Sequence, residues 1–278
     1  MNIGLFPNLE KIETIIAAKS IAEYLAARGV TVFAEDSIAK DLQVYPLSKA
    51  KSAEIAYLIS LGGDGTIIQL FHRYPDIQAP TMAINMGHLG FMADIKSNEI
   101  YSSLDLLLKG QCQIHHRLSL QGKSQENSHF ALNDIVVHRG TNLNLIDYTV
   151  HIDDKYLNTF SADGIIFSTP CGSTAYSLAA GGPIVMPALE AIVITPICPH
   201  TISNRPIVVM PSSELRIEFE HMGVDIAFDG CKFQDMSRST SLTITRSKKY
   251  FQFAHLPTYD FYATLRSKLG WTGKVRLT

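Results

Sequence analysis

A carboxylate stands inside a glycine cluster at residues 60–66, which have the sequence S-L-G-G-D-G-T. Gly62, Gly63 and Gly65 lack side chains, so their backbone N–H groups can approach the oxygens of a phosphate. A free aspartate is ionised at neutral pH and repels phosphate, so Asp64 needs a different task. It could accept a proton from an attacking hydroxyl, or it could help to hold Mg²⁺ that bridges phosphates. The alternative is a tight turn in which Asp64 caps the following helix.

The cluster differs from the two best-known phosphate loops. It lacks the Gly-Lys-Ser/Thr of a Walker A loop, and it is not the G-x-G-x-x-G of a dinucleotide-binding turn. If it binds phosphate, the expected contacts are Gly63, Gly65 and Thr66, where the positive end of a helix dipole adds to the backbone donors.

A second stretch rich in small residues spans 161–183, with the sequence S-A-D-G-I-I-F-S-T-P-C-G-S-T-A-Y-S-L-A-A-G-G-P. Ser173 is expected to cap a short helix, which would leave the amides of Thr174 and Ala175 free for an anion. Tyr176 offers a flat face to a nucleobase or a hydroxyl to a ribose. The alternative is a Gly-Pro turn beside a core tyrosine.

Other polar residues and one aromatic residue extend the candidate site. Asp163 can accept hydrogen bonds from a ribose diol. Asn133 and Asp134 interrupt the apolar pattern A-L-N-D-I-V-V and need polar partners, which ribose hydroxyls would supply; a β-bulge or an edge-strand turn is the alternative. Phe91 ends the glycine-containing loop N-M-G-H-L-G-F and could stack on an adenine or a nicotinamide, although it could also be a core residue. His88 in that loop is assigned no chemistry.

The elements that must position these residues change in type along the chain. Up to Gly110, strand and helix patterns alternate, which predicts a doubly wound, Rossmann-like α/β domain. The expected strands are 2–6, 30–34, 55–61 and 81–85, and the expected helices are 11–28, with Gly29 after it, 66–74 and 97–108.

After Gly110 the pattern becomes β-rich, which predicts a sandwich-like second domain with one short helix near 173–180. The expected strands are 113–120, 130–138, 148–153, 159–168, 214–219, 224–228 and 241–246. Residues 259–269 return to helical spacing. We therefore expect an α/β domain of residues 1–111 and 256–278 and a β-rich domain of residues 112–255.

Composition limits the partners of the chain. Its 278 residues, 46% of them hydrophobic, suffice for two domains with cores of their own. A formal net charge of −2 gives no reason to expect nucleic acid. The sequence has no signal peptide pattern and no apolar run of about 18 residues, so no membrane association is expected. Four cysteines without a close pair predict free thiols in a reducing cytoplasm.

Taken together, these stretches resemble the NAD kinase family from the start of the chain to near its end. The matching motifs are G-G-D-G-T at 62–66, N-M-G-H-L-G-F at 85–91, L-N-D at 132–134, A-D-G-I-I-F-S-T-P-C-G-S-T-A-Y-S-L at 162–178, G-G-P at 181–183, P-H-T-I-S-N-R-P at 199–206 and Y-D-F-Y-A-T-L-R-S-K-L-G-W at 259–271. G-G-D-G-T alone is shared with lipid kinases and phosphofructokinases. The S-T-P-x-G-S-T-A-Y block and the closing L-G-W are more specific.

The resemblance implies a reaction and a site. The γ-phosphoryl group of ATP would pass, with a divalent metal such as Mg²⁺, to the 2′-hydroxyl of the adenosine ribose of NAD⁺, with Asp64 as proton acceptor. Asn133 and Asp134 would contact the dinucleotide, and Asp163 its nicotinamide end, often from a neighbouring subunit. The expected adenosine-side contacts are Thr174, Ala175, Tyr176, Ser177, Leu178 and Ala179.

The family fold implied by the resemblance has an α/β domain, a β-rich domain and a final helix that packs back on the first. The family forms homodimers or homotetramers. The chain departs from the family pattern at four positions: Asp134 is the shorter form of a Glu/Asp position, Cys171 replaces a common Thr, Ala179 stands where a Ser is frequent, and Cys231 follows Asp229-Gly230 where Gln is common. A lipid kinase and a non-catalytic NAD-binding sensor are the rival interpretations.

Overall fold

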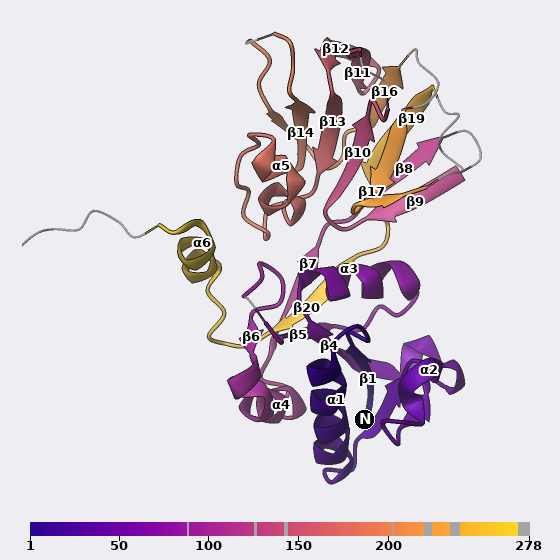
Figure 1. The fold of residues 1–278 in the computed structure, drawn as a ribbon, viewed down its shortest axis with the longest axis vertical. Helices are drawn as coiled ribbons and strands as arrows, with labels where there is room; N and C mark the ends of the chain where they lie inside the picture. Colours follow the sequence, from indigo (N-terminus) through magenta and orange to yellow (C-terminus); the bar gives the residue numbers. More distant parts are fainter. Residues whose placement is uncertain are drawn as a thin grey trace, which may run out of the picture. The chain divides into compact units, whose positions relative to one another are not determined.

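The computed structural model describes residues 1–87, 89–124, 127–141, 144–201, 203–219, 224–233 and 240–271. They form two compact units (Figure 1). The first contains Met1–His116 and the described residues from Phe251 onward, and the second contains Arg117–Tyr250. His88 and Ile202, which belong to two of the quoted motifs, lie outside the described residues.

A parallel sheet forms the centre of the first unit. Its strand order is β3-β2-β1-β4-β5-β20-β7, and β6 pairs with β5. The strands are β1 (Asn2–Pro7), β2 (Thr31–Ala34), β3 (Tyr45–Pro46), β4 (Ile55–Gly62), β5 (Thr81–Asn85), β6 (Ile95–Lys96), β7 (Gln113–Arg117) and β20 (Phe251–His255). The pairs that join β1 to β2 and β4, and β5 to β4 and β20, are all parallel.

Helices cover both faces of this sheet. They are α1 (Ile12–Ala26), α2 (Asp36–Ala39), α3 (Asp64–Arg73) and α4 (Ile100–Leu108), and a further helix, α6 (Phe261–Leu269), follows β20 in the chain. Ile21 of α1 and Leu104 of α4 share one buried cluster with alternate residues of the strands, whereas Leu70 of α3 packs in a second cluster with Phe6 and Leu58. This two-sided cover confirms the doubly wound α/β domain.

The glycine cluster follows β4, at the point where the order of the parallel strands reverses. From β1 the chain continues to β2 on one side, whereas β4 and β5 follow on the other, so the order reverses between β1 and β4. The amide of Asn8, just after β1, donates to the carbonyl of Leu61 in β4 at 2.8 Å. Ligands of open α/β sheets bind at the carboxyl ends of strands at such a reversal. Asp64 stands there.

Two six-stranded antiparallel sheets form the second unit. One has the order β15-β14-β13-β10-β17-β18 and the other β12-β11-β16-β19-β8-β9. The strands are β8 (Leu120–Ser124), β9 (Asn127–Ala131), β10 (Asp134–His138), β11 (Ile146–Ile152), β12 (Lys155–Ala162), β13 (Gly164–Ser168), β14 (Ile192–Ile197), β15 (Ile207–Val209), β16 (Leu215–Phe219), β17 (Asp225–Phe228), β18 (Cys231–Lys232) and β19 (Ser241–Arg246). Inward residues of both sheets form one core, which confirms the sandwich.

The chain crosses between the two sheets at polar residues. The sequence predicts single strands over 130–138 and 159–168. In the structure each is two strands that belong to different sheets, β9 with β10 and β12 with β13. Asn133 lies at the first crossing and Asp163 at the second. The polar residue therefore marks a strand break, where the backbone leaves one ladder for the next, and the β-bulge alternative for Asn133 is wrong.

Three further elements differ from the predictions. The stretch 113–120 is divided, and β7 joins the sheet of the first unit rather than the sandwich. The predicted helix 173–180 is a 3-10 turn (Gly172–Thr174) followed by the one-turn helix α5 (Tyr176–Ala179). Helix α3 begins at Asp64, two residues earlier than expected, which places the carboxylate in the first helical turn.

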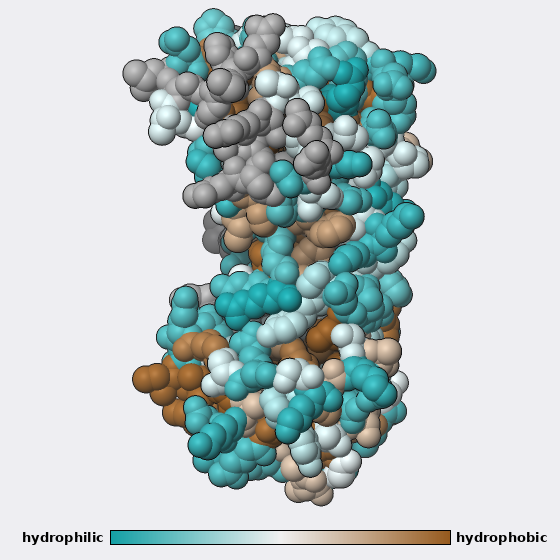
Figure 2. Space-filling model, turned by 90° about the vertical axis from the view of Figure 1, so that its right-hand side faces the viewer, coloured by the Kyte–Doolittle hydropathy of each residue, from teal (hydrophilic) through white to brown (hydrophobic). Residues whose placement is uncertain are grey.

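The final helix belongs to the first unit, as the family resemblance implies. A cavity of about 500 Å³ is lined both by α6 and by the segment from Leu89 to Glu99. The face in Figure 2 is largely hydrophilic, with separate hydrophobic patches. Among the described residues no helix is long and apolar enough to cross a bilayer.

Candidate functional site

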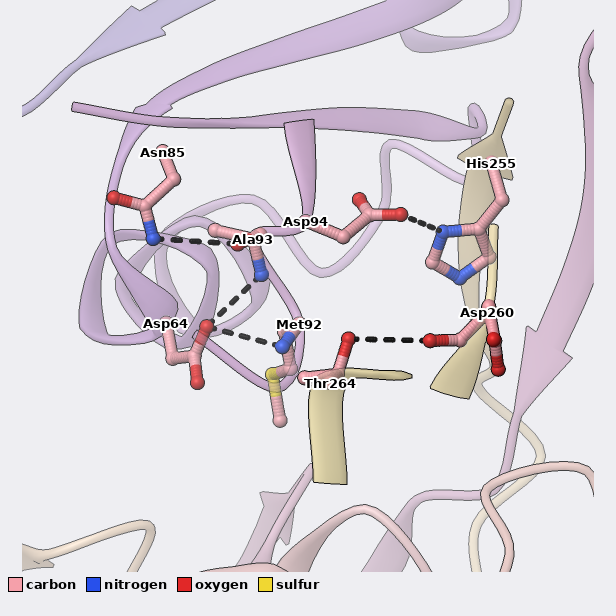
Figure 3. Close-up of polar contacts among 8 residues, drawn as sticks. All are labelled: Asp64, Asn85, Met92, Ala93, Asp94, His255, Asp260 and Thr264. Carbon is pink, nitrogen blue, oxygen red and sulfur yellow. Dashed lines mark hydrogen bonds and ion pairs between the residues drawn. The ribbon is translucent and has the colours of Figure 1, made fainter. Parts of the chain in front are cut away.

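The Asp64 carboxylate is held by the backbone of a neighbouring loop (Figure 3). Its Oδ1 accepts the amides of Met92 and Ala93 at 3.1 and 2.9 Å, as Figure 3 shows. Its Oδ2 accepts the amide of Phe91 at 2.8 Å. Gly63 is the N-cap residue of α3, and no side chain caps that helix. The helix-cap alternative for Asp64 is therefore wrong, because its acceptors face residues 91–93.

This arrangement leaves Asp64 with limited free capacity. An ionised carboxylate offers about four acceptor positions. Three of them receive N–H groups, two on Oδ1 and one on Oδ2. Oδ2 therefore retains about one position, which can accept a hydroxyl proton or contact a cation.

Four glycines of the two loops fall into two groups. A Cβ on Gly62 would overlap the side chain of Thr66, and a Cβ on Gly90 would overlap the Asp64 carboxylate. In contrast, a Cβ on Gly63 or Gly65 would meet nothing within 4 Å. Internal packing therefore explains why Gly62 and Gly90 are glycines. It does not explain Gly63 and Gly65, where the surface is open, as expected for a backbone that a ligand approaches.

Packing also accounts for Thr66 and leaves Phe91 available. Thr66 is buried, and its hydroxyl lies against Gly62, so the Thr66 side chain supports the loop from within. Phe91 is half-buried and belongs to none of the described buried clusters, and the Lys268 ammonium lies 5.8 Å from the centroid of its ring. The core alternative for Phe91 is therefore not supported.

Four of the predicted residues line one pocket of about 610 Å³ in the second unit. The residues that line this pocket are Asn133, Asp134, Val136, His138, Ala175, Tyr176, Asp225, Ala227, Asp229, Gly230 and Lys232. Tyr176 is 44% exposed, so the core-tyrosine alternative is wrong. The pocket thus combines a flat aromatic face with buried polar groups.

Asn133 presents an unsatisfied acceptor. Its side chain is largely buried, and among the described residues its Oδ1 has no hydrogen-bond partner. A buried acceptor without a donor costs about 1–3 kcal/mol. Because Asn133 lines the pocket, a ligand with an N–H or O–H group can supply that donor.

Asp229 holds the backbone of this turn, and the sequence reasoning missed it. Its carboxylate accepts the amides of Leu132, Asn133 and Asp134 at 2.8, 2.6 and 3.1 Å. The residue adopts a left-handed φ of 50° before Gly230. The Asp-Gly pair at the end of a predicted strand was the available signal, because Asp tolerates that conformation and accepts nearby N–H groups.

Asp134 is buried beside that second carboxylate. Burial raises the pKa of Asp134 from 3.8 to about 7, and the charge of Asp229 adds to the shift. Near neutral pH the Asp134 side chain can therefore either donate or accept a hydrogen bond.

Residues of the small-residue stretch 161–183 support the backbone of Asn133. The amide of Thr169 donates to the carbonyl of Asn133 at 2.8 Å, and its hydroxyl donates to the carbonyl of Leu132 at 2.6 Å. A Cβ on Gly172 would overlap the Asn133 carbonyl. Thr169 and Gly172 therefore shape the site through packing, a role that the sequence reasoning did not assign.

The predicted cap at Ser173 is wrong. The Ser173 hydroxyl donates to the carbonyl of Pro170 at 2.6 Å and accepts the amide of Val185 at 3.0 Å. The amide of Ala175 is already bonded to the carbonyl of Gly172 at 2.9 Å. The helix that follows has a single turn, so this segment offers no free row of amides to an anion.

The remaining residues of the turn have different environments. The buried Ser177 hydroxyl bonds to that of Thr195 at 2.9 Å, and the Thr174 hydroxyl donates to the carbonyl of Cys171 at 3.0 Å. Leu178 is half-buried and Ala179 exposed. None of Thr174, Ser177, Leu178 and Ala179 lines the pocket described above.

Asp163 is paired within its own chain. Its Oδ1 lies 2.7 Å from Nε of Arg139, and its carbonyl accepts the Arg139 amide at 2.9 Å and the Tyr148 hydroxyl at 3.3 Å. Burial, and then the charge of Asp163, raise the pKa of Tyr148. Asp163 is not part of the pocket around Asn133.

Comparison with known proteins agrees with both units. Residues 3–112 match the model of the ATP-NAD kinase N-terminal domain, and residues 132–256 match that of the ATP-NAD kinase C-terminal domain. The chain is 46% identical over 278 residues to the NAD kinase of Protochlamydia amoebophila, covering 99% of this chain and 100% of the relative.

The chain belongs to the NAD kinase family. It is 35% identical to the NAD kinase of Geotalea daltonii, with 97% of this chain and 98% of the relative covered. Membership in the NAD kinase family makes the protein a phosphotransferase that phosphorylates NAD, so the lipid-kinase and sensor interpretations are set aside.

Solved structures show the same NAD kinase fold. Yeast NADH kinase complexed with NADH superposes with a TM-score of 0.90 at 26% identity, covering 100% of this chain and 90% of that chain. An NAD kinase from Archaeoglobus fulgidus in complex with ATP gives a TM-score of 0.78 at 22% identity, with coverage of 98% and 100%. At that identity the second likeness concerns the fold alone.

Proposed function

We propose that this NAD kinase transfers the γ-phosphoryl group of ATP to the 2′-hydroxyl of the adenosine ribose of NAD⁺, with Asp64 acting on that hydroxyl. The carrying observation is the Asp64 carboxylate, fixed by three amides with about one acceptor position of Oδ2 left over. It stands where ligands of an open α/β sheet bind.

Asp64 would act in one of two ways, as a general base or as a carboxylate linked to a metal. An aspartate is a weak base at neutral pH, so the hydroxyl proton would move mainly as its oxygen begins to bond to phosphorus. General-base assistance of this kind accelerates a reaction by roughly 10²–10⁴-fold. Holding the carboxylate rigidly favours either role, because positioning supplies most of the catalysis in phosphoryl transfer.

The ATP phosphates would lie against the backbone of Gly63 and Gly65, where the surface is open. The positive end of the α3 dipole adds attraction for the anion. The absence of side chains at Gly63 and Gly65 matters because a Cβ at either position would occupy the space of a phosphate oxygen.

In the first unit, the residues fit a magnesium ion whose ligands come partly from the protein and partly from the substrate phosphates. Within the described residues no group of three or more His, Cys, Asp or Glu side chains could hold a metal. Mg²⁺ commonly binds one or two carboxylates together with substrate phosphates, so the free position on Asp64 Oδ2 suits it. When bound, the ion neutralises phosphate charge.

NAD⁺ would occupy the pocket of the second unit. The unsatisfied Oδ1 of Asn133 would accept from an amino or hydroxyl group, Asp134 would bond to ribose, and Tyr176 would stack on the adenine. Ala175 lines the same pocket. We keep Asp163 as a candidate for the nicotinamide end, where its ion pair with Arg139 would have to rearrange or be shared.

Two broader expectations belong to this proposal. The family resemblance supports a homodimer or homotetramer. None of the four cysteines forms a disulfide, and we retain the expectation of a reducing, cytoplasmic compartment.

A coupled assay for NADP⁺ tests the proposal. Purified protein is given NAD⁺ with ATP, with polyphosphate or with no donor, and diacylglycerol or NADH replaces NAD⁺ in parallel. We expect NADP⁺ from ATP and NAD⁺, and for Asp64→Asn a kcat lowered roughly 10²–10⁴-fold with the fold retained. Near-normal turnover by a folded Asp64→Asn variant would remove both roles of the carboxylate.

A further inference from the structure

His255, the last residue of β20, carries a buried imidazole that the proposed reaction does not use. Its side chain is 3% exposed. The ring lies between those of Tyr259, at 3.8 Å between centroids and 12° between planes, and Phe253, at 5.2 Å and 11°. Its Nδ1 lies 3.1 Å from Oδ2 of Asp94. We assign the ring hydrogen to Nδ1, so that the imidazole donates and the Asp94 carboxylate accepts.

Asp94 directly follows the amides that hold Asp64. The amide of Ala93 donates to Asp64 at 2.9 Å, while its carbonyl accepts the Asn85 side-chain amide at 3.3 Å. One residue later, the side chain of Asp94 meets His255 (Figure 3). Ala93 and Asp94 are therefore fixed through an N–H, a C=O and a side chain, each by a different element.

The C-terminal segment contacts the same loop at a second point. Tyr259, which stacks on His255, precedes Asp260, whose carboxylate caps α6 through the amides of Tyr262 and Ala263 at 2.8 and 3.1 Å. Near the end of α6, the Lys268 ammonium lies 5.8 Å from the ring centroid of Phe91. The segment thus holds the loop from Phe91 to Asp94 at both ends.

We propose that His255 is a positioning residue for Asp64. By bonding to Asp94 it fixes the loop whose amides orient the Asp64 carboxylate, and so determines which acceptor position Asp64 presents to the substrate hydroxyl. This inference rests on the proposed function for the role of Asp64, and it goes further by naming the residue pair that maintains the geometry.

A purely structural role would need only the aromatic stack. Phenylalanine would fill the space between Tyr259 and Phe253 without a polar group, whereas a buried imidazole is favourable only with a partner. Asp94 is such a partner, and it lies in the loop that holds Asp64. The two roles therefore separate when the hydrogen bond is removed and the ring is kept.

Two variants of the full chain make this separation. His255→Phe keeps the stack and removes the donor to Asp94. His255→Asn loses the ring but keeps an amide N–H that can donate to Asp94. The matched control is His129→Phe, because His129 also stacks on an aromatic ring, that of Phe233 at 3.8 Å, but lies in the second unit.

The readouts are steady-state kinetics and hydrogen–deuterium exchange of the peptide that contains residues 91–93. For His255→Phe we expect kcat to fall at least ~10-fold with KM for NAD⁺ and ATP within about twofold, since a small displacement of reacting groups is costly. The amides of residues 91–93 should exchange at least ~10-fold faster. His255→Asn should recover part of both losses, and His129→Phe should change neither.

Two outcomes overturn the proposal: unchanged exchange of residues 91–93 in His255→Phe, or greater loss in His255→Asn than in His255→Phe. If His255→Phe unfolds, His255→Asn and Asp94→Asn decide through the same exchange measurement. Failure of the proposed function gives a different pattern, with Asp64→Asn active while His255→Phe still speeds exchange of residues 91–93.

Discussion

Asp64 and Asp229 use the same hydrogen-bond arrangement in different units. Each carboxylate accepts three consecutive backbone amides, those of residues 91–93 and those of residues 132–134. Such contacts to a charged acceptor are worth about 1.5–3 kcal/mol each in stability. A carboxylate can therefore order a loop and still keep an acceptor position for a ligand, which explains how an acidic residue can stand within a glycine cluster that we propose binds phosphate.

Asp134 gives a prediction about pH at the scale of one residue. Its pKa is 3.8 in the unfolded chain and about 7 in the folded protein, because burial and then Asp229 disfavour the charge. The folded state holds this proton more tightly than the unfolded chain does. The contribution of the protonated Asp134 to the free energy of unfolding is therefore fully present below about pH 4 and is lost as pH rises to about 7. Asp134→Asn cannot ionise and should escape that loss.

We expect the stability of Asp134→Asn, relative to the natural protein, to increase with pH. Relative to the natural protein, its free energy of unfolding should rise between pH 4 and 7 by up to about 4 kcal/mol and stay level above that. Thermal unfolding between pH 4.5 and 8.5 measures it, with Asp225→Asn, at a more exposed carboxylate of the same pocket, as control. Parallel pH profiles for the Asp134 variant and the natural protein would show that Asp134 keeps its charge on folding.

At the scale of elements, the boundaries of strands and helices decide where the site residues point. Strong periodicity made β1, β5 and α1 predictable to within a few residues. The merged strands 130–138 and 159–168 were mispredicted because local hydrophobicity does not reveal which sheet a residue joins. Asn133 was still recognised as unusual in a strand, and the sheet crossing explains why it is there.

The contacts that hold the site lie far apart in sequence, and this limited prediction. Asp229 and Asn133 are separated by 96 residues, and Asp64 and Ala93 by 29. Residue types identify Asp64, Asn133 and Tyr176 as chemically unusual, but pairing across such distances depends on topology. For that reason the polar residues were found from the sequence, whereas Asp229 and the role of Gly90 were not.

The glycines of α3 and of the loop after β5 give a prediction at this scale. Gly65 lies in the first turn of α3 with open space around it, so Gly65→Ala should stabilise the fold by about 0.5–1 kcal/mol. If ATP phosphates lie there, the new methyl group should raise KM for ATP about 10-fold or more, an energy of about 1.4 kcal/mol.

Gly90→Ala is the matched comparison and should behave oppositely. Its methyl group would overlap the Asp64 carboxylate, so the variant should be less stable and lose kcat by about 10²-fold. Melting temperatures and kinetics of the two variants test the pair. A Gly65→Ala variant that is more stable and uses ATP normally would mean that phosphate does not approach this backbone.

At the scale of the molecule, each unit has its own core and its own candidate ligand-contacting residues. The glycine cluster and Asp64 belong to the first unit, whereas the pocket with Asn133 and Tyr176 belongs to the second. The hydrophobic clusters that support them are also separate. A substitution in one unit should therefore alter one ligand and leave the scaffold for the other intact.

This separation predicts opposite effects on the two ligands. Tyr176→Ala should weaken NAD⁺ binding by about 1–3 kcal/mol, the value of one base stacked on an aromatic ring, with little change for a non-hydrolysable ATP analogue. Gly63→Ala should weaken binding of the ATP analogue and leave NAD⁺ binding unchanged. No internal contact opposes the new methyl group, so the fold should be retained. Calorimetric titration of the full chain with each ligand alone measures both affinities, and Tyr156→Ala, at an exposed tyrosine of the second unit outside the pocket, is the control. If either variant weakened both ligands equally, the assignment of one ligand to each unit would be wrong.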